Sequence, residues 1–354
     1  MFAALLLVTC ICGGPAKAPQ AHARYAELPL RNLSGDHDAG EAVTGRLRAA
    51  LRARGAEFVE PGVVEALLQS HRIRYTDSLS VAEARMLEAE TGAQHLIAGV
   101  MLEFVRGSKP RIAVGLRVLG ADSGVREQSA VVSLRGEDSR AWLGLGAIED
   151  ADVLADTVVA RLLEIFLPDG SVKPEPSHAR RTPDTGDEEG PRRERLLGQN
   201  ACRLAVMPFV NRSTRAEAGV QFGEILSNEW FHERGVEVVE ASELRAAMVT
   251  EKIRYMHDLD LKALAAIART AGVRYFALGS VESYGEEEQV VDARFPVVEA
   301  TVRLLDAQTG LVVASAAVRT RGDDHRQPLG FGLVQDPIAL AQQAARKLVR
   351  TLED

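Results

Sequence analysis

The sequence predicts two tandem domains of the mixed α/β class. Each is expected to be a mixed sheet covered by helices, in the order β-α-β-α-α-β-β-β-α. The first reason is a repeat, because residues 54–99 and 234–279 align without a gap and are identical at 12 of 46 positions. The second is the length of 354 residues, which suggests about two domains. The third is the composition, since 46% hydrophobic and 26% charged residues are typical of folded proteins.

The first domain, residues 22–167, owes its predicted elements to hydrophobic periodicity and to turn residues. Apolar residues spaced by three and four predict helices, and alternating ones predict strands. Gly55 and Gly92 are expected to end helices, and the turn from Asp122 to Gly124 to close a hairpin. The expected strands are residues 24–30, 57–60, 95–105, 111–119 and 125–135, and the expected helices are residues 43–54, 61–68, 79–90 and 150–166.

The second domain, residues 201–354, repeats this order. Asn211 stands in the turn after the first strand, as Asn32 does in the first copy. The offset between the copies grows from 180 to 186 after Tyr284, so the second copy has gained residues there. The added segment is acidic and begins with residues 285–288, and we expect it to be a protruding loop.

A linker separates the two copies at residues 168–200. Five prolines punctuate a run of mixed charge that contains almost no apolar residue before Leu196. Such a segment cannot bury enough surface to offset the entropy of ordering its backbone. We therefore expect it to be disordered and fairly extended.

The first residues, 1–21, are typical of a signal or lipoprotein-like segment followed by a tether. Their apolar run is about half of the roughly 20 residues that a transmembrane helix needs. It has the length of a signal-peptide core. The residues from Leu7 to Cys10 resemble a bacterial lipobox, which makes Cys10 the candidate for lipidation. These features predict a periplasmic protein anchored to the outer membrane; the alternative is the frayed N-terminus of a cytosolic protein.

Charge and motifs exclude several function classes. The net charge of -8 leaves no basic footprint for nucleic acid. The three cysteines form neither a disulfide framework nor a metal-ligand spacing, and the eight histidines show no paired metal spacing. No Gly-x-Ser-x-Gly, His-Glu-x-x-His or P-loop motif occurs. We therefore expect no catalytic residue, no metal and no cofactor, and no enzyme activity.

Three motifs of the second copy resemble a known family. Residues 205–213 are similar to the strand and turn that open the TolB N-terminal-like domains, residues 271–280 to their central strand, and residues 302–310 to their hairpin. This family includes the CsgG-like curli-secretion lipoprotein and the lipoprotein activators of penicillin-binding proteins. The resemblance implies a periplasmic, lipid-anchored, non-catalytic domain that binds other envelope proteins or its own copies.

The sequence thus predicts a non-enzymatic cell-envelope adaptor or assembly protein. Its expected partners are other envelope proteins, further copies of itself, and the membrane through an N-terminal lipid at Cys10. A related alternative is a component or regulator of a secretion or peptidoglycan-synthesis machine. An alternative of another class is a ligand- or nucleotide-responsive sensor, or an enzyme with an unrecognised site, and a deep pocket with converging polar groups would favour it.

Two repeated motifs are candidate sites. Ile-Arg-Tyr occurs in both copies, and its arginines and tyrosines are of the types that interfaces favour. The interaction candidates are Arg74, Tyr75, Arg254 and Tyr255. The alternative is structural, with the tyrosines closing the core between two helices.

The second motif is the Gly-x-Gly that precedes each last helix. Backbone N–H groups at a helix N-terminus can bind an anion there. Asp150 and Asp336 instead predict capped helix starts, because their carboxylates would occupy those termini.

Overall fold

The computed structural model describes residues 23–139, 147–167, 202–233, 236–253, 260–290, 293–326 and 332–353. The expected linker, the N-terminal segment with Cys10, and the candidates Arg254 and Tyr255 lie outside these residues.

The first domain is a six-stranded mixed sheet with helices on both faces. The strands run in the order β3-β1-β4-β5-β6, and β2 pairs with β4. Pairs of β1 with β3 and β4 are parallel, whereas β4-β5 and β5-β6 are antiparallel. The elements are β1 (Arg24–Glu27), β2 (Arg31–Asn32), α1 (Ala39–Arg52), β3 (Glu57–Phe58), α2 (Pro61–Ser70), α3 (Val81–Thr91), β4 (His95–Val105), β5 (Arg111–Gly120), β6 (Arg126–Arg135), the 3-10 helix η1 (Gly136–Ser139) and α4 (Ala151–Phe166).

The second domain has the same topology. Its strands run in the order β12-β11-β10-β7-β9, and β8 pairs with β10. The elements are β7 (Cys202–Val206), β8 (Val210–Asn211), α5 (Ala218–Phe231), β9 (Val236–Val239), α6 (Ala241–Thr250), α7 (Leu261–Ala271), β10 (Tyr275–Val290), β11 (Ala293–Asp306), β12 (Val312–Arg321) and α8 (Pro337–Glu353). The predicted fold class, two tandem domains with mixed sheets, is confirmed.

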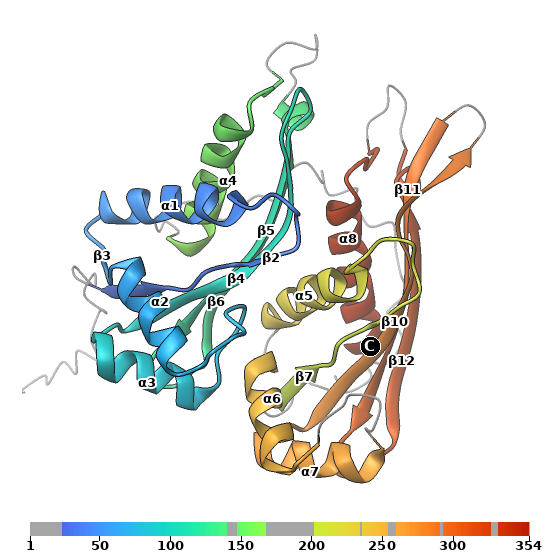
Figure 1. Cartoon of the computed structure of the whole chain (residues 1–354). Helices are drawn as coiled ribbons and strands as arrows, with labels where there is room; N and C mark the ends of the chain where they lie inside the picture. Colours follow the sequence, from blue (N-terminus) through green and yellow to red (C-terminus); the bar gives the residue numbers. More distant parts are fainter. Residues whose placement is uncertain are drawn as a thin grey trace, which may run out of the picture.

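The two domains stack as four alternating layers (Figure 1). Helices α1 and α4 cover one face of the first sheet, and α5 and α8 of the second domain lie between the two sheets. The second sheet forms the outer layer. Helices α2 and α3, like α6 and α7, pack at one end of their own sheet. The first sheet is therefore covered on both faces, and the second on one face and at one end.

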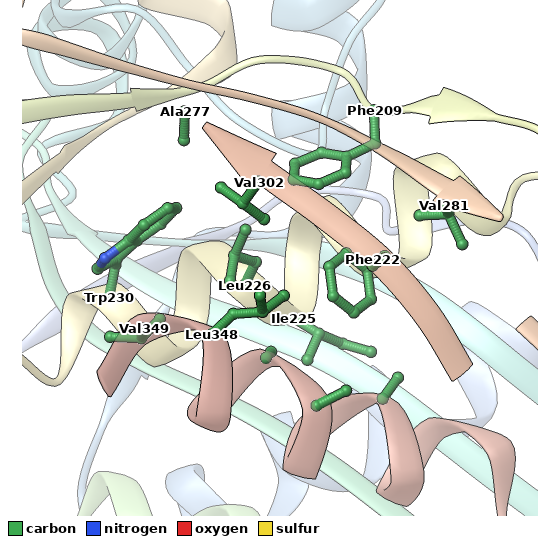
Figure 2. Close-up of a cluster of buried hydrophobic side chains, with 14 of the residues drawn as sticks. Phe209, Phe222, Ile225, Leu226, Trp230, Ala277, Val281, Val302, Leu348 and Val349 are labelled. Carbon is green, nitrogen blue, oxygen red and sulfur yellow. The ribbon is translucent and has the colours of Figure 1, made fainter. Parts of the chain in front are cut away.

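The largest hydrophobic core lies under the helices of the second domain (Figure 2). Phe222 and Trp230 project from α5 at helical spacing and are fully buried. Leu348 and Val349 of α8 pack beside them, against β11. Burying a side chain of this size stabilises a fold by about 1.5–3 kcal/mol. The same cluster includes Val100 and Leu102 of the first domain, so this core continues across the domain boundary.

The glycines shared by the two copies have structural causes. Gly92 and Gly272 end α3 and α7 in the left-handed conformation, with φ of +69° and +66°. Gly99 and Gly279 lie in the central strands, where a Cβ atom would collide with the carbonyl oxygens of Gly115 and Thr301. The repeat therefore records the requirements of one fold used twice.

The acidic segment gained after Tyr284 is strand, so the expected loop is wrong. Strand β10 continues to Val290 and pairs with β11 as far as the partners Val290 and Ala293. The added residues lengthen both neighbouring strands, because β10 has 16 residues where β4 has 11 and β11 has 14 where β5 has 10, so the backbone pairing continues through the insertion. None of the described helices has the length and apolar character needed to cross a membrane.

Candidate functional site: the contact between the two domains

The outer face of the first sheet, opposite α1 and α4, is apolar and is covered by the second domain. Val100 and Leu102 of β4, Ala113 of β5 and Val131 of β6 point to this face and are buried against the second domain. Gly115 lies among them, and Glu224 of α5 approaches its Cα so closely that a Cβ atom would lie 3.1 Å from Oε1. An apolar face with a gap for one side chain is typical of a specific interface.

Two glutamine side chains dock the helices on the backbone of this sheet. Gln221 of α5 donates a hydrogen bond from Nε2 to the carbonyl oxygen of Leu102, at 2.9 Å. Gln342 of α8 donates one to the carbonyl oxygen of Val131, at 2.8 Å. Leu102 lies in a bulge of β4, and Val131 lies on the edge strand β6. Such positions leave carbonyl groups outside the ladder, and the glutamines satisfy them.

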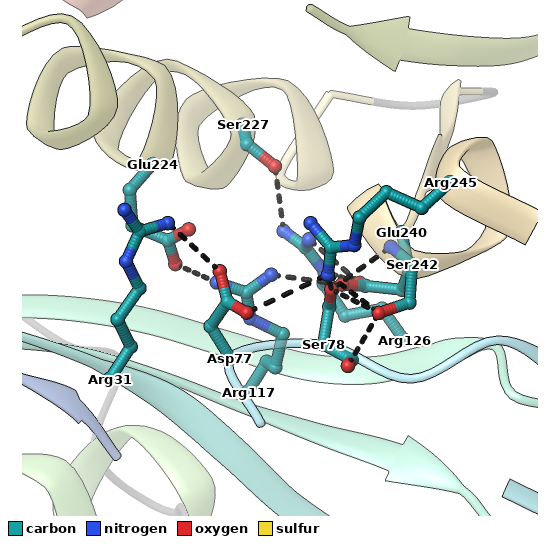
Figure 3. A network of polar contacts seen from close by, with 10 residues as sticks. All are labelled: Arg31, Asp77, Ser78, Arg117, Arg126, Glu224, Ser227, Glu240, Ser242 and Arg245. Carbon is teal, nitrogen blue, oxygen red and sulfur yellow. Dashed lines mark hydrogen bonds and ion pairs between the residues drawn. The ribbon is translucent and has the colours of Figure 1, made fainter. Parts of the chain in front are cut away.

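Four charged side chains form a buried ion-pair network at this contact (Figure 3). Arg117 Nη1 lies 2.9 Å from Glu240 Oε2, and Arg126 Nη2 lies 2.7 Å from Glu240 Oε1. Arg117 also pairs with Glu224. Arg126 donates a further hydrogen bond to the hydroxyl of Ser227, at 3.1 Å. The two arginines belong to the first sheet and the two glutamates to the second domain, so the network has no net charge and holds the domains together.

Burial and ion pairing act in opposite directions on these groups. Burial alone would raise the pKa of Glu240, but the charges of Arg126 and Arg117 hold it below its ordinary value. Burial would lower the pKa of Arg117, yet Glu224 and Glu240 raise it above its ordinary value. Burial lowers the pKa of Arg126, which nevertheless stays charged at neutral pH. All three groups are therefore ionised in the folded protein.

A second polar cluster joins the start of α6 to the loop before α3. Ser78, in the loop before α3, accepts a hydrogen bond from the backbone N–H of Ser242 at 3.0 Å, and the Ser242 hydroxyl donates to the carbonyl oxygen of Ser78 at 2.8 Å. Arg245 of α6 donates to both hydroxyls, at 3.1 and 2.7 Å. Glu243 accepts a hydrogen bond from the N–H of Val81, at 3.0 Å. The start of α6 is thus fixed on the loop that leads into α3.

The structure places one predicted interaction residue at this cluster. Tyr75 is 55% exposed, and the guanidinium carbon of Arg245 lies 4.2 Å from the centre of its ring. The interpretation that Tyr75 closes the core is therefore wrong; a cation–π contact joins it to the other domain. Arg74 is exposed beside it, and Ile73 packs half-buried on the core of α2 and α3.

The described helix starts after the Gly-x-Gly motifs are capped by carboxylates. Asp150 accepts a hydrogen bond from the N–H of Asp152 at 2.7 Å, and Asp336 accepts one from the N–H of Ile338 at 2.9 Å. Asp336 is buried at the domain contact, where its other oxygen accepts a hydrogen bond from the hydroxyl of Ser133. Negative charge therefore occupies both termini, as the sequence predicted.

A groove of about 300 Å³ opens at the seam between the domains. Its lining combines Ser129 and Val131 of β6 with His232, Asn228, Glu229, Gln342 and Arg346 of the second domain, together with Ala130 and Ile165. Arg346 Nε lies 3.2 Å from Glu229 Oε2, and burial lowers the pKa of His232. Within the described ranges, no group of three or more His, Cys, Asp or Glu side chains could hold a metal ion.

Comparisons with known proteins give likenesses to solved structures at low identity. No family model and no curated protein matches the chain. Among solved structures, the chain resembles the PelC dodecamer of Paraburkholderia phytofirmans at 20% identity and a TM-score of 0.32, over 46% of this chain and 96% of that one. It also resembles the lipoprotein GNA1162 of Neisseria meningitidis (16% identity, TM-score 0.29, 40% of this chain and 99% of that one). A third likeness is to the C-terminal domain of LpoB from Escherichia coli (20% identity, TM-score 0.27, 34% and 82%). Each likeness spans less than half of this chain.

Proposed function

We propose that this chain is a non-enzymatic adaptor or assembly protein of the bacterial cell envelope, anchored to the outer membrane through a lipid on Cys10. In this proposal its two domains act as one rigid body that binds other envelope proteins. The TolB N-terminal-like or CsgG-like relationship belongs to the same proposal, because it rests on the motifs in the second copy.

The observation that carries the proposal is the contact between the domains. The buried ion pairs of Arg117 and Arg126 with Glu224 and Glu240 bind one domain to the other. In the first domain the outer sheet face is a surface on which another protein layer docks. The apolar N-terminal run and the lipobox-like residues before Cys10 support a place in the envelope.

The experiment compares the full tagged chain with two cysteine variants in a bacterial host. Wild type and Cys12→Ala are expected in the outer-membrane fraction, and Cys10→Ala in the soluble periplasm. After cross-linking, the same envelope proteins should be recovered with wild type and with Cys10→Ala, because the lipid anchors the protein and the folded domains bind. If wild type and Cys10→Ala both remain in the cytosol, the envelope proposal is wrong.

The groove at the domain seam favours a second candidate, a ligand-responsive protein. Its size is at the lower end of the range for small-molecule sites, which is about 300–1,000 Å³. Arg346 and Glu229 could bind the carboxylate and the amino group of a small zwitterion. Thermal unfolding in the presence of amino acids tests this: a ligand of this site raises the Tm of wild type and leaves that of Arg346→Ala unchanged. If no amino acid raises the Tm of wild type, this candidate is excluded for that class of ligand.

A further inference from the structure

The contact between the two domains joins unlike surfaces of one fold. The first domain contributes the outer face of its sheet, and the second contributes its helices α5 and α8. A contact of this kind is heterologous, because each domain keeps the surface that the other has used. The second sheet still has an outer face, and the first domain still has α1 and α4. Further copies of the chain could add at both ends unless these surfaces prevent it.

The registers of the two sheets show which residues are equivalent. His95 pairs with Gly120 in the first sheet, and Tyr275 pairs with Asp306 in the second. Strand β4 therefore matches β10 with an offset of 180, and β5 and β6 match β11 and β12 with an offset of 186. Helices α1 and α5 have the same length and begin at Ala39 and Ala218, so their residues match with an offset of 179.

The outer face of the second sheet lacks the apolar character of the first. Leu102 and Ala113 of the first sheet are replaced by Glu282 and Glu299, whose side chains are 33% and 38% exposed. Ser280 takes the place of Val100. Glu282 pairs with Arg212 at 3.5 Å and Glu299 with Arg319 at 2.8 Å, so a helix layer that packed here would have to bury or break these two ion pairs.

The gap that receives a glutamate is also closed on the second sheet. Glu224 lies over Gly115 in the first sheet, and the residue equivalent to Gly115 is Thr301. Arg303 stands where Arg117 stands in the first sheet, but it is exposed. The second sheet thus keeps the arginine of the buried network and fills the space that its partner glutamate would need.

The helices of the first domain carry the complementary changes. Gly45 occupies the position of Glu224, so α1 cannot supply the glutamate. Asp152 and Asp156 occupy the positions of Ile338 and Gln342, and both are exposed. Arg46 Nη2 and Nε bind these two carboxylates, each at 2.9 Å. The helix layer of the first domain is therefore charged where that of the second domain docks.

We propose that the chain makes this head-to-tail contact once, within itself, and blocks its repetition at both ends. Charge on the second sheet and on α1 and α4 keeps a second copy of this chain from adding to either surface. The protein is a closed two-domain unit.

Sedimentation velocity tests the proposal on the full chain with Cys10→Ala and Cys12→Ala, which prevent lipidation. This parent is expected to sediment as one chain at every concentration. Two variants each open one end only and should also remain single chains. The sheet variant carries Glu282→Leu, Glu299→Ala and Thr301→Gly. The helix variant carries Gly45→Glu, Asp152→Ile and Asp156→Gln. The combination of all six substitutions should sediment as two or more chains, and more so as the concentration rises.

Two outcomes of this experiment overturn the proposal. One is a parent chain that self-associates and is dispersed by Thr301→Arg, because copies would then be using the face that we consider blocked. The other is a combined variant that retains its circular dichroism spectrum and cooperative unfolding but stays a single chain at every concentration.

Chemical trapping gives a second test that does not depend on the fold of the combined variant. Ser133 and Asp336 touch across the contact within one chain, and their equivalents on the free surfaces are Arg319 and Asp150. In the same parent, Ser133→Cys with Asp336→Cys should be joined within one chain by a short bifunctional thiol reagent. A mixture of Arg319→Cys chains and Asp150→Cys chains should give no joined pairs. A joined pair at levels near that of the internal control contradicts the proposal.

Discussion

Arg117 of β5 and Glu240 at the start of α6 form a buried ion pair of 2.9 Å that joins the two domains. Their equivalents in the other copy, Arg303 and Glu60, are the same residue types, yet both are exposed, and Glu60 binds Arg52 at the surface. The pair is therefore not a property of the residues alone. It forms because the first sheet and the start of α6 are the surfaces that meet.

Removing the charge of Glu240 should destabilise the protein far more than removing that of Glu60. Glu240→Gln leaves Arg117 and Arg126 buried with Glu224 as their remaining carboxylate, and breaking such a network costs about 3–5 kcal/mol. Glu60→Gln is the matched control and should change the free energy of unfolding by no more than about 0.5 kcal/mol. Urea unfolding measures both. Equal effects of the two substitutions would show that the network contributes nothing.

The contribution of Glu240 should disappear in acid. Its pKa is lowered in the folded protein, so its stabilisation is complete above the unfolded value of about 4.5 and is lost as the pH falls through the folded pKa. Wild type should therefore lose its advantage over Glu240→Gln when urea unfolding is repeated at steps from neutral pH to about pH 3. A difference between the two proteins that stays constant over this range would contradict the assignment.

Filling the gap over Gly115 should weaken the contact between the domains. Gly115→Thr places a Cβ atom 3.1 Å from Oε1 and 3.2 Å from Cγ of Glu224, and overpacking of this kind costs about 1–3 kcal/mol. On an open sheet face the same change should be neutral or stabilising, because threonine favours strands more than glycine does. The sign of the change in unfolding free energy thus distinguishes a covered face from an open one. Thr301→Ser, on the open face, is the control and should have little effect.

The central-strand glycines should tolerate no side chain. Gly99→Ala and Gly279→Ala each drive a methyl group into a backbone carbonyl of the neighbouring strand, and we expect losses of about 1–3 kcal/mol. Gly62→Ala is the control, because nothing lies within 4 Å of its added Cβ and it stands in the first turn of α2. Alanine there should leave stability unchanged or raise it by up to about 1 kcal/mol. Thermal unfolding followed by circular dichroism gives the order of the three variants.

The fold could be predicted from the sequence because its signals are local and occur twice. The apolar stripe of α5, the glycines that end α3 and α7, and the aspartates that cap α4 and α8 each depend on a few neighbouring residues. The acidic insertion after Tyr284 was the exception, because its charge and its position between two strands predict a loop. Strand β10 continues through it, since the backbone of two lengthened strands can pair whatever the side chains are.

The domain contact could not be predicted in the same way. Gln221, Glu224 and Asn228 on α5 look like a solvated helix face, but the arrangement of the domains buries Gln221 and Asn228 and leaves Glu224 13% exposed. One signal was present: β4 is apolar at successive positions from Leu96 to Leu102, as a strand covered on both faces should be. The corresponding Ser280 and Glu282 in β10 show that only one copy has this property. The contact of Tyr75 with Arg245 could not be predicted either, because it joins residues far apart in the chain.

The central claim is that the buried contact makes the two domains one unit, and calorimetry tests it most directly. Wild type should unfold in a single transition whose calorimetric and van 't Hoff enthalpies agree. Leu102→Glu, which buries an unpaired charge in the contact, should split this into two transitions, whereas Glu282→Gln on the open face should not. Two independent transitions in wild type, with midpoints that Leu102→Glu leaves unchanged, would contradict the account.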